Sequence, residues 1–206
     1  MTWKPQYIAA TDLADWIGVD PSDPNLAVVI EAASRAVDHA ANRQFGSTTA
    51  TLEFMPVFHK GRWFAETEDL QSVTGVALVH NDGTVIQDIT DYILTPRNAA
   101  LNNRPYTWVE WRGMGSPSYW YEYGWGYYPH PAQHPVQVTG QFGWAAVPQP
   151  IQLATRIQAG RFYERQTTVM PLNSQRIDDV SYSFTQNLDP DIETSIAPFR
   201  RQWGAV

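Results

Sequence analysis

Two stretches of helix-forming sequence, residues 23–45 and 148–166, are separated by a long segment with the features of strands and turns. In the first stretch, apolar residues recur at i, i+3, i+4, i+7, i+11, i+14 and i+15, which places them on one face of a helix. They are Leu26, Val29, Ile30, Ala33, Val37, Ala40 and Ala41. Asp23 can cap the helix, Pro24 suits its first position, and Gly46 can end it in a left-handed conformation. The sequence therefore predicts a long amphipathic helix from Asp23 to Phe45.

The second stretch begins at Pro148 and Pro150 and differs from the first in having apolar residues on two sides. Leu153, Ile157 and Gly160 lie on one side, whereas Ile151 and Phe162 lie on another. We expect such a helix to contact two neighbours. A short helix capped by Thr11, with one face formed by Leu13, Trp16 and Ile17, should precede the first stretch and end at Gly18. A last helix should begin at Asp189 and Pro190, with apolar positions Ile192, Ile196, Phe199 and Trp203 and an interruption at Pro198.

The segment from Thr49 to Ala145 favours strands, because prolines recur along it and helix is disfavoured. A hairpin is predicted where Asn81, Asp82 and Gly83 separate two runs of branched residues, since Asp-Gly favours the positive φ angles of a tight turn. We therefore expect an α+β fold, with a helical core of two long helices plus short N- and C-terminal helices and a β-rich antiparallel insertion. The helical part would comprise residues 1–48 and 146–206, and the aromatic insertion residues 49–145.

Composition narrows the classes of function. The 206-residue chain carries a net charge of −7 and has no run of lysine or arginine, which argues against binding to phosphate backbones. Cysteine is absent, which removes thiolate metal sites and cysteine nucleophiles. No apolar run is long enough to span a bilayer, and the first five residues lack the features of a signal peptide, so we expect a cytosolic protein with no membrane partner.

No combination of residues indicates catalysis. His130 and His134 have the i, i+4 spacing of a helical metal site, but the prolines around them exclude that helix. Paired carboxylates, such as Glu66 with Glu68, are common on polar surfaces, and no Gly-x-Ser-x-Gly motif is present. We expect no catalytic residue, metal or cofactor, and a hydrolase using Glu66, Glu68 or Glu122 is the least favoured reading.

The segment from Tyr106 to Tyr128 is crowded with tyrosine and tryptophan. Such rings can fill a core, anchor an interface or stack on sugars. We favour core plus interface for the insertion aromatics Trp108, Trp111, Trp120 and Trp125, and the alternative is a carbohydrate-binding accessory module that uses residues 106–128.

The C-terminal segment places Arg200 and Arg201 beside Phe199 and Trp203. Arginine and tryptophan are enriched among the residues that dominate binding at interfaces. We expect a docking tail, and the alternative is a frayed end of chance composition.

Taken in order, five segments resemble the head-to-tail connector (adaptor) family of tailed bacteriophages. They are Tyr7 to Ile17, Ile30 to Asp38, Asn42 to Phe45, Val136 to Trp144 followed by Val147 and Pro148, and Ala197 to Arg201. The resemblance spans most of the chain. The departure is the insertion, because the shorter members that resemble this chain have little between their helices.

The resemblance implies a structural virion protein with no enzymatic activity. Identical subunits, twelve in the virion, would close into a ring beneath the portal, and DNA would pass through the channel without specific binding. The tail residues Ile196, Phe199, Arg200, Arg201 and Trp203 would dock on the portal, and the other end would meet a stopper or tail-completion protein. The helix faces between subunits would include Glu31, Arg35, Asp38, Ile151, Arg156 and Phe162. The protein would lie in the neck of the virion and, during assembly, in the host cytoplasm.

Overall fold

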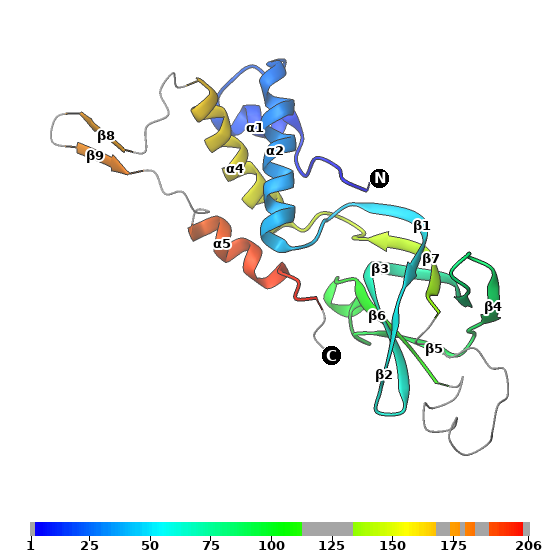
Figure 1. Cartoon of the computed structure of the whole chain (residues 1–206). Helices are drawn as coiled ribbons and strands as arrows, with labels where there is room; N and C mark the ends of the chain where they lie inside the picture. The colour runs from blue at the N-terminus through cyan, green and yellow to red at the C-terminus, as the bar shows by residue number, and fades with distance from the viewer. Residues whose placement is uncertain (1–2, 113–133, 168–173, 178–179, 184–189, 204–206) are drawn as a thin grey trace, which may run out of the picture. The chain divides into compact units, whose positions relative to one another are not determined.

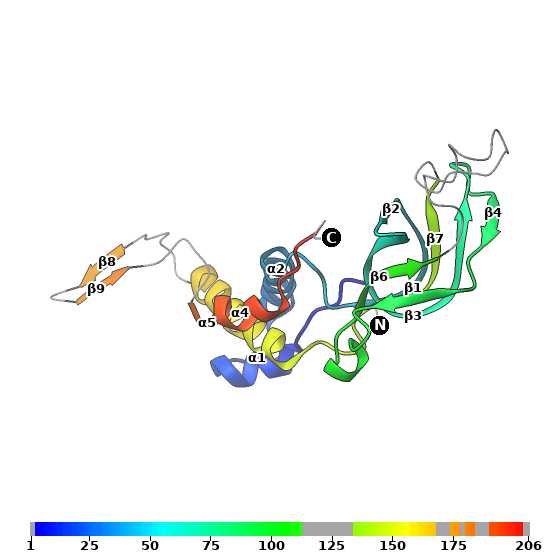
Figure 2. The ribbon, with the colours of Figure 1, turned by 90° about the horizontal axis from the view of Figure 1, so that it is seen from below.

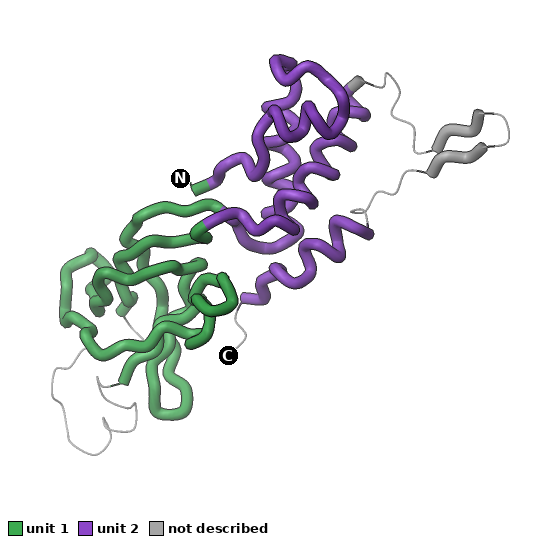
Figure 3. Tube along the Cα trace, turned by 180° about the vertical axis from the view of Figure 1, so that it is seen from behind, with its two compact units in different colours: residues 1–3, 46–145 green, residues 4–45, 146–206 purple. Residues whose placement is uncertain are grey.

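A computed structural model describes residues 3–112, 134–167, 174–177, 180–183 and 190–203. The chain divides into two compact units (Figure 3). Residues 1–3 and 46–145 form a sheet unit, and residues 4–45 and 146–206 form a helical unit. The α+β class and the antiparallel sheet are confirmed. The description of the fold as a helical core with an inserted sheet does not match the structure well, because the sheet has a hydrophobic core of its own.

The helical unit contains α1 (Ala10–Ile17), α2 (Pro24–Ala41), α4 (Gln149–Thr167), α5 (Pro190–Ile196) and the short helix η3 (Ala197–Phe199) (Figures 1 and 2). At the start of α2, the Asp23 side chain accepts the Asn25 N–H at 2.9 Å, as the capping pattern predicted. The predicted end was wrong, because Asn42 rather than Gly46 takes the left-handed conformation, with φ of 52°. The predicted start of α1 was also late, since the chain is helical from Ala10 and Gly18 ends it.

The core of the helical unit combines branched aliphatic residues with alanines. Leu26, Val29, Ile30 and Ala33 of α2 meet buried residues of α1 and Ala159 of α4. Both sides of α4 have neighbours within the helical unit, because Ile151 and Ala154 are buried and Gly160 faces α1, while Leu153 on the Gly160 side stays exposed. A Cβ at Gly160 would stand 3.6 Å from Cγ2 of Ile17. The two-sided helix thus has two sets of neighbours, and they belong to its own chain.

Among its described residues the sheet unit holds seven antiparallel strands: β1 (Ser47–Phe54), β2 (Pro56–His59), β3 (Arg62–Val79), β4 (Val85–Asp88), β5 (Tyr92–Thr95), β6 (Tyr106–Trp111) and β7 (Val136–Gly143). The main order is β1-β7-β3-β6-β5, and β2 and β4 both pair with β3. β3 is long enough to pair with β2 and β6 along its first part and with β7 and β4 along its second. The short helix η1 (Ala100–Asn102) joins β5 to β6.

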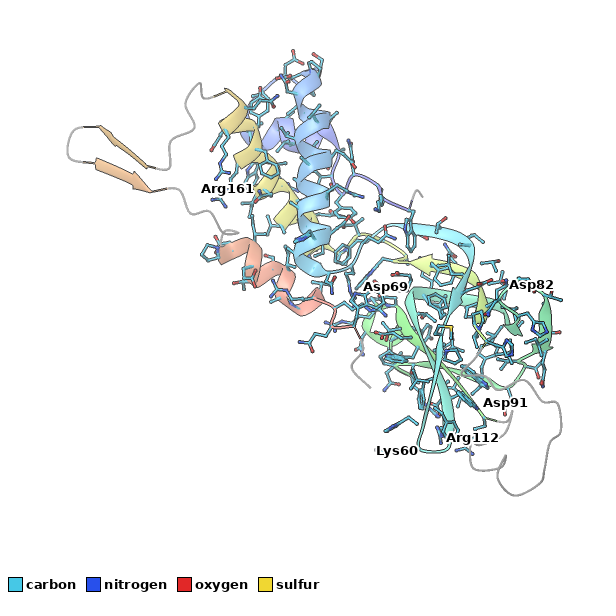
Figure 4. All side chains as sticks on the ribbon, viewed as in Figure 1. Lys60, Asp69, Asp82, Asp91, Arg112 and Arg161 are labelled. Carbon is cyan, nitrogen blue, oxygen red and sulfur yellow. The ribbon has the colours of Figure 1, made fainter. Side chains whose placement is uncertain are left out.

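Aromatic rings and close backbone approaches hold this sheet together. Trp63 and Trp111 are cross-strand partners whose rings stack with centroids 6.5 Å apart. Gly140 lets β7 approach β3, because a Cβ there would stand 2.1 Å from the Ser72 carbonyl oxygen. The Trp144 indole N–H donates to buried Asp69 at 2.8 Å, and Figure 4 labels this carboxylate.

The predicted hairpin at 81–83 is confirmed between β3 and β4. Gly83 has φ of 85°, the His80 N–H donates to the Thr84 carbonyl at 2.8 Å, and the Asp82 carboxylate accepts the Thr84 N–H at 2.9 Å (Figure 4). β2 and the first half of β3 were not predicted. Their hairpin turns at Lys60 and Gly61, both with positive φ, and its lysine obscured the turn signal.

β8 (Ser174–Ile177) and β9 (Val180–Ser183) pair antiparallel in a separate two-stranded sheet. None of the helices in the described ranges is both long and apolar enough to cross a membrane.

Candidate interaction surfaces

The helical unit exposes a tryptophan at the contact of α1 with α4. Trp16 is 56% exposed, and the Arg156 guanidinium lies 5.5 Å from its ring centroid. Leu153 precedes Arg156 by three residues, so the two share a face of α4, and Leu153 is also exposed. We call Trp16, Leu153 and Arg156 the Trp16 patch.

The Trp16 patch combines a ring, an aliphatic side chain and a cation. Arg156 Nε is buried without a hydrogen-bond partner, and among the described residues no carboxylate lies within ion-pair distance of this guanidinium. Aromatic residues and arginine are enriched at protein interfaces, and tryptophan and arginine dominate their energetics. The patch therefore has the chemistry of a protein contact.

A second exposed face lies on α2. Val28 is 62% exposed, and Glu31 and Ala32, one turn further on, are exposed as well. The helical repeat places these three positions opposite Leu26, Ile30 and Ala33, which pack inward. We call Val28, Glu31 and Ala32 the outer face of α2. Since α1 and α4 pack on the inward side of α2, the two surfaces point in different directions.

Arg35 and Asp38, which sequence reasoning assigned to a contact between subunits, hold the N-terminal segment of their own chain. The Arg35 guanidinium donates to the Pro5 carbonyl at 2.7 Å and pairs with Asp38 at 3.3 Å. Tyr7 donates its hydroxyl hydrogen to Asp38, and the hydroxyl oxygen accepts the Phe45 N–H at 2.9 Å. These contacts tie residues 5–7 to the C-terminal half of α2 and to Phe45, which follows the helix.

Burial governs the ionisation of this cluster. Removal from water raises the pKa of Tyr7 well above its usual range, and the hydrogen bond to Asp38 adds to the shift. Burial also raises the pKa of Asp38, although the Tyr7 hydroxyl and the Arg35 charge oppose it. The cluster of Tyr7, Arg35 and Asp38 therefore has a structural role, and Asp38 is the carboxyl group in it whose pKa is raised.

The other helix-face predictions divide between surface and core. Glu31 is exposed, with its side chain 3.5 Å from Arg35. Ile151 has no exposed surface in the chain and belongs to the core, while Phe162 is half-buried against the α1–α2 cluster. Of the six predicted residues, Glu31 and Arg156 therefore remain the best placed for contact with another molecule.

The predicted docking tail lies against the C-terminal end of α2. The Arg201 N–H donates to the Ala41 carbonyl at 2.9 Å, and Arg200 Nε donates to the Ala40 carbonyl at 3.0 Å. The Trp203 indole N–H reaches the Asn42 carbonyl at 3.3 Å, and the Arg201 guanidinium covers the Trp203 ring at 3.5 Å from its centroid. These donors satisfy carbonyls that a helix end leaves free, and the two arginines complement its negative dipole end.

Within the tail, burial separates structural from available residues. Ile196 and Arg201 are buried, whereas Arg200 and Trp203 are exposed and Phe199 is half-buried edge-on to Phe45. Arg200 also pairs with Glu193 at 2.9 Å. A partner would therefore meet Phe199, Arg200 and Trp203.

The aromatics of the sheet unit are mainly structural where the structure describes them. Trp111 is 2% exposed, and half-buried Trp108 packs edge-on to Phe64 at 6.5 Å. Trp120 and Trp125 lie outside the described residues, as does His130. Trp111 is consequently unavailable for stacking on a sugar.

The histidines and carboxylates in the described part of the chain form no metal-binding cluster. No three His, Cys, Asp or Glu residues there gather as metal ligands would. The His134 ring packs edge-on to His80 at 5.1 Å, and buried Glu110 pairs with Arg62 across the sheet. Asp23, whose pKa is held below its usual value by hydrogen bonds from Tyr163 and the Asn25 N–H, serves as a helix cap.

Sequence reasoning missed the outward position of Trp16 by placing it on one face with Leu13 and Ile17. The structure buries Leu13 and exposes Trp16. Ala14, also buried, was the available signal, because Leu13, Ala14 and Ile17 define a stripe centred away from Trp16.

Comparison with solved structures gives full-length similarities of fold. A chain in the virion of a native gene transfer agent (GTA) particle has a TM-score of 0.57 and 18% sequence identity, covering 100% of this chain and 96% of that chain. A chain in the neck of an empty GTA particle, computed with C6 symmetry, has a TM-score of 0.57 and 17% identity over the same shares. A chain in the neck of a native GTA particle, computed with C12 symmetry, has a TM-score of 0.55 and 18% identity, again over the same shares.

These similarities show that the fold is shared. No protein-family model matches the sequence, and no curated protein matches it either.

Proposed function

We propose that this protein is a structural component of a virion neck, in which identical copies form a closed ring between the portal and the tail. The observation that carries the proposal is the similarity of fold to chains in two neck structures, which covers the whole of this chain and 96% of each of those chains. Those necks were computed with C6 and C12 symmetry, which favours a ring of twelve copies here.

The surfaces of the helical unit support this proposal. In a ring of identical copies, each copy contacts its two neighbours through two different surfaces. The interface is head-to-tail, so it joins one surface of a copy to a different surface of the next copy. The Trp16 patch and the outer face of α2 provide two such surfaces on one compact unit.

Charge is consistent with a passive role toward nucleic acid. A net charge of −7 opposes adhesion to DNA, so that DNA would pass through the channel without specific binding.

We assign the portal contact to the exposed part of the tail, which comprises Phe199, Arg200 and Trp203. The opposite end of the ring would meet a stopper or tail-completion protein. The protein would act in the virion neck after assembly in the host cytoplasm.

The test is electron microscopy of the full-length protein mixed with the portal protein of the same virus. The proposal predicts rings of sixfold or twelvefold symmetry stacked on the portal. Portal particles that carry no additional density, with this protein present in excess, would overturn the proposal.

A further inference from the structure

We propose that the Trp16 patch of one copy binds the outer face of α2 of the next copy, with Arg156 paired to Glu31 across the contact. The inference rests on the proposed ring and names the surfaces that join its subunits. The partner is therefore a second copy of this chain.

The first support is that the helical unit leaves large apolar groups outside while its interior is closed. Trp16, Val28 and Leu153 are exposed although α1, α2 and α4 already share a buried cluster. Exposed apolar groups that gather beside a charged residue are typical of protein contacts rather than of free surface.

The second support is complementarity of charge. Arg156 has an aromatic neighbour but no carboxylate partner among the described residues. Glu31 stands beside Val28, and its side chain is 48% exposed despite the 3.5 Å approach to Arg35. Docking the two surfaces would bring the Arg156 guanidinium of one copy to the Glu31 carboxylate of the next. It would also pack Trp16 and Leu153 against Val28 and Ala32.

The third support is direction. The outer face of α2 is the side opposite its packing on α1 and α4, whereas the Trp16 patch lies on α1 and α4 themselves. Two different surfaces that face different ways produce a head-to-tail interface, and such an interface closes into a ring when its rotation closes.

The inference is tested by charge reversal in the full-length protein, with ring formation on portal counted by electron microscopy. Arg156→Glu and Glu31→Arg should each lower the fraction of protein in rings by about tenfold or more, because each places like charges together. The double variant, R156E with E31R, should restore ring formation. Circular dichroism and thermal unfolding should show each variant folded.

Matched controls come from equivalent changes outside the two surfaces. Arg165→Glu reverses an exposed arginine nine residues along α4, which the helical repeat places on the opposite side from Arg156. Asp88→Arg reverses an exposed carboxylate in β4. Both controls should form rings as the wild type does.

The outcomes separate this inference from the proposed function. Rings formed by the wild type and undisturbed by either single reversal would overturn the contact while leaving the ring intact. Folded single variants that fail, with a double variant that fails equally, would overturn the Arg156–Glu31 pairing. Wild-type protein that forms no ring on portal would overturn the proposed function itself.

Discussion

The two units place the same residue type in opposite positions. In the sheet unit, Trp63, Trp111 and Trp144 are each at most 3% exposed. In the helical unit, Trp16 and Trp203 are 56% and 43% exposed. Trp63, Trp111 and Trp144 therefore stabilise the sheet unit, whereas Trp16 and Trp203 keep ring surface available for contact with another molecule.

The difference follows from how each unit packs. The buried cluster shared by α1, α2 and α4 is formed by aliphatic side chains such as Leu13, Leu26 and Ile30 together with alanines. Trp16 and Trp203 do not belong to this cluster. In the sheet unit, by contrast, the rings of Trp63, Trp111 and Phe142 belong to the buried core itself.

The largest expected effect on stability comes from replacing a buried tryptophan of the sheet unit. Trp111→Ala should lower the free energy of unfolding by about 3–5 kcal/mol, because it leaves a large cavity beside Trp63. Urea titration followed by circular dichroism measures the change. Trp108→Ala, at a half-buried neighbouring position, should cost clearly less, and equal losses would show that the buried ring has no special role.

The close approach of β7 to β3 gives the second prediction. Gly140→Ala should cost about 1–3 kcal/mol, since its Cβ would collide with the Ser72 carbonyl oxygen and the backbone would have to move. Gly75→Ala is the matched control, because its nearest neighbour, Thr139 Cβ, would stand at 4.0 Å. A thermal unfolding series in which the two variants behave alike would contradict the assignment.

The tail gives the third prediction. Trp203→Ala removes the hydrogen bond to the Asn42 carbonyl and the ring under Arg201, and should cost about 0.5–1.5 kcal/mol. Gln202→Ala, at an exposed neighbouring position, should leave stability unchanged. Hydrogen exchange at the C-terminal end of α2 should increase in the Trp203 variant, and unchanged exchange there would argue against the capping role.

The fourth prediction concerns an exposed tryptophan of the helical unit, Trp16. Trp16→Ala should alter the stability of the isolated chain by less than about 0.5 kcal/mol, because the ring is mainly in solvent. It should nevertheless reduce ring formation. A large loss of stability, measured by the same urea titration used for Trp111→Ala, would place Trp16 with the structural tryptophans instead.

The smallest effect concerns pH. Burial raises the pKa of Asp38 above its ordinary value of 3.8, so the folded protein takes up this proton at higher pH than the unfolded chain does. The stability contributed by the carboxyl is complete below 3.8 and is lost as the pH rises through the raised pKa. Relative to Asp38→Asn, the wild type should therefore become more stable on acidification through that window. A relative loss of stability in thermal unfolding at falling pH would contradict the sign.

Local signals in the sequence were sufficient for part of this structure. The helical spacing of apolar residues predicted α2, and the Asp-Gly turn predicted the β3–β4 hairpin, because both signals depend on residues close together in the sequence. The end of α2 was mispredicted, since Asn42 competes with Gly46 for the left-handed position. The length of β3 was also missed, because its partners β6 and β7 lie far along the chain.

The candidate surfaces depended more on tertiary contacts. Arg35 and Asp38 were expected to face another subunit, but the N-terminal segment engages them through Pro5 and Tyr7. Ile151 is covered by its own chain. Glu31 and Arg156 were identified from the sequence, whereas the outward side of Trp16 became evident only from the packing of α1 on α4.

The most direct measurement is the mass, by mass photometry, of assemblies formed on the portal by the wild type and by Trp16→Ala. The wild type should add about 280 kDa, which is twelve times the 23.3 kDa of one chain, while the folded Trp16 variant adds little. Wild-type protein that adds no mass to the portal, or a Trp16 variant that adds the same mass as the wild type, would contradict the assignment of outward tryptophan to contacts between copies.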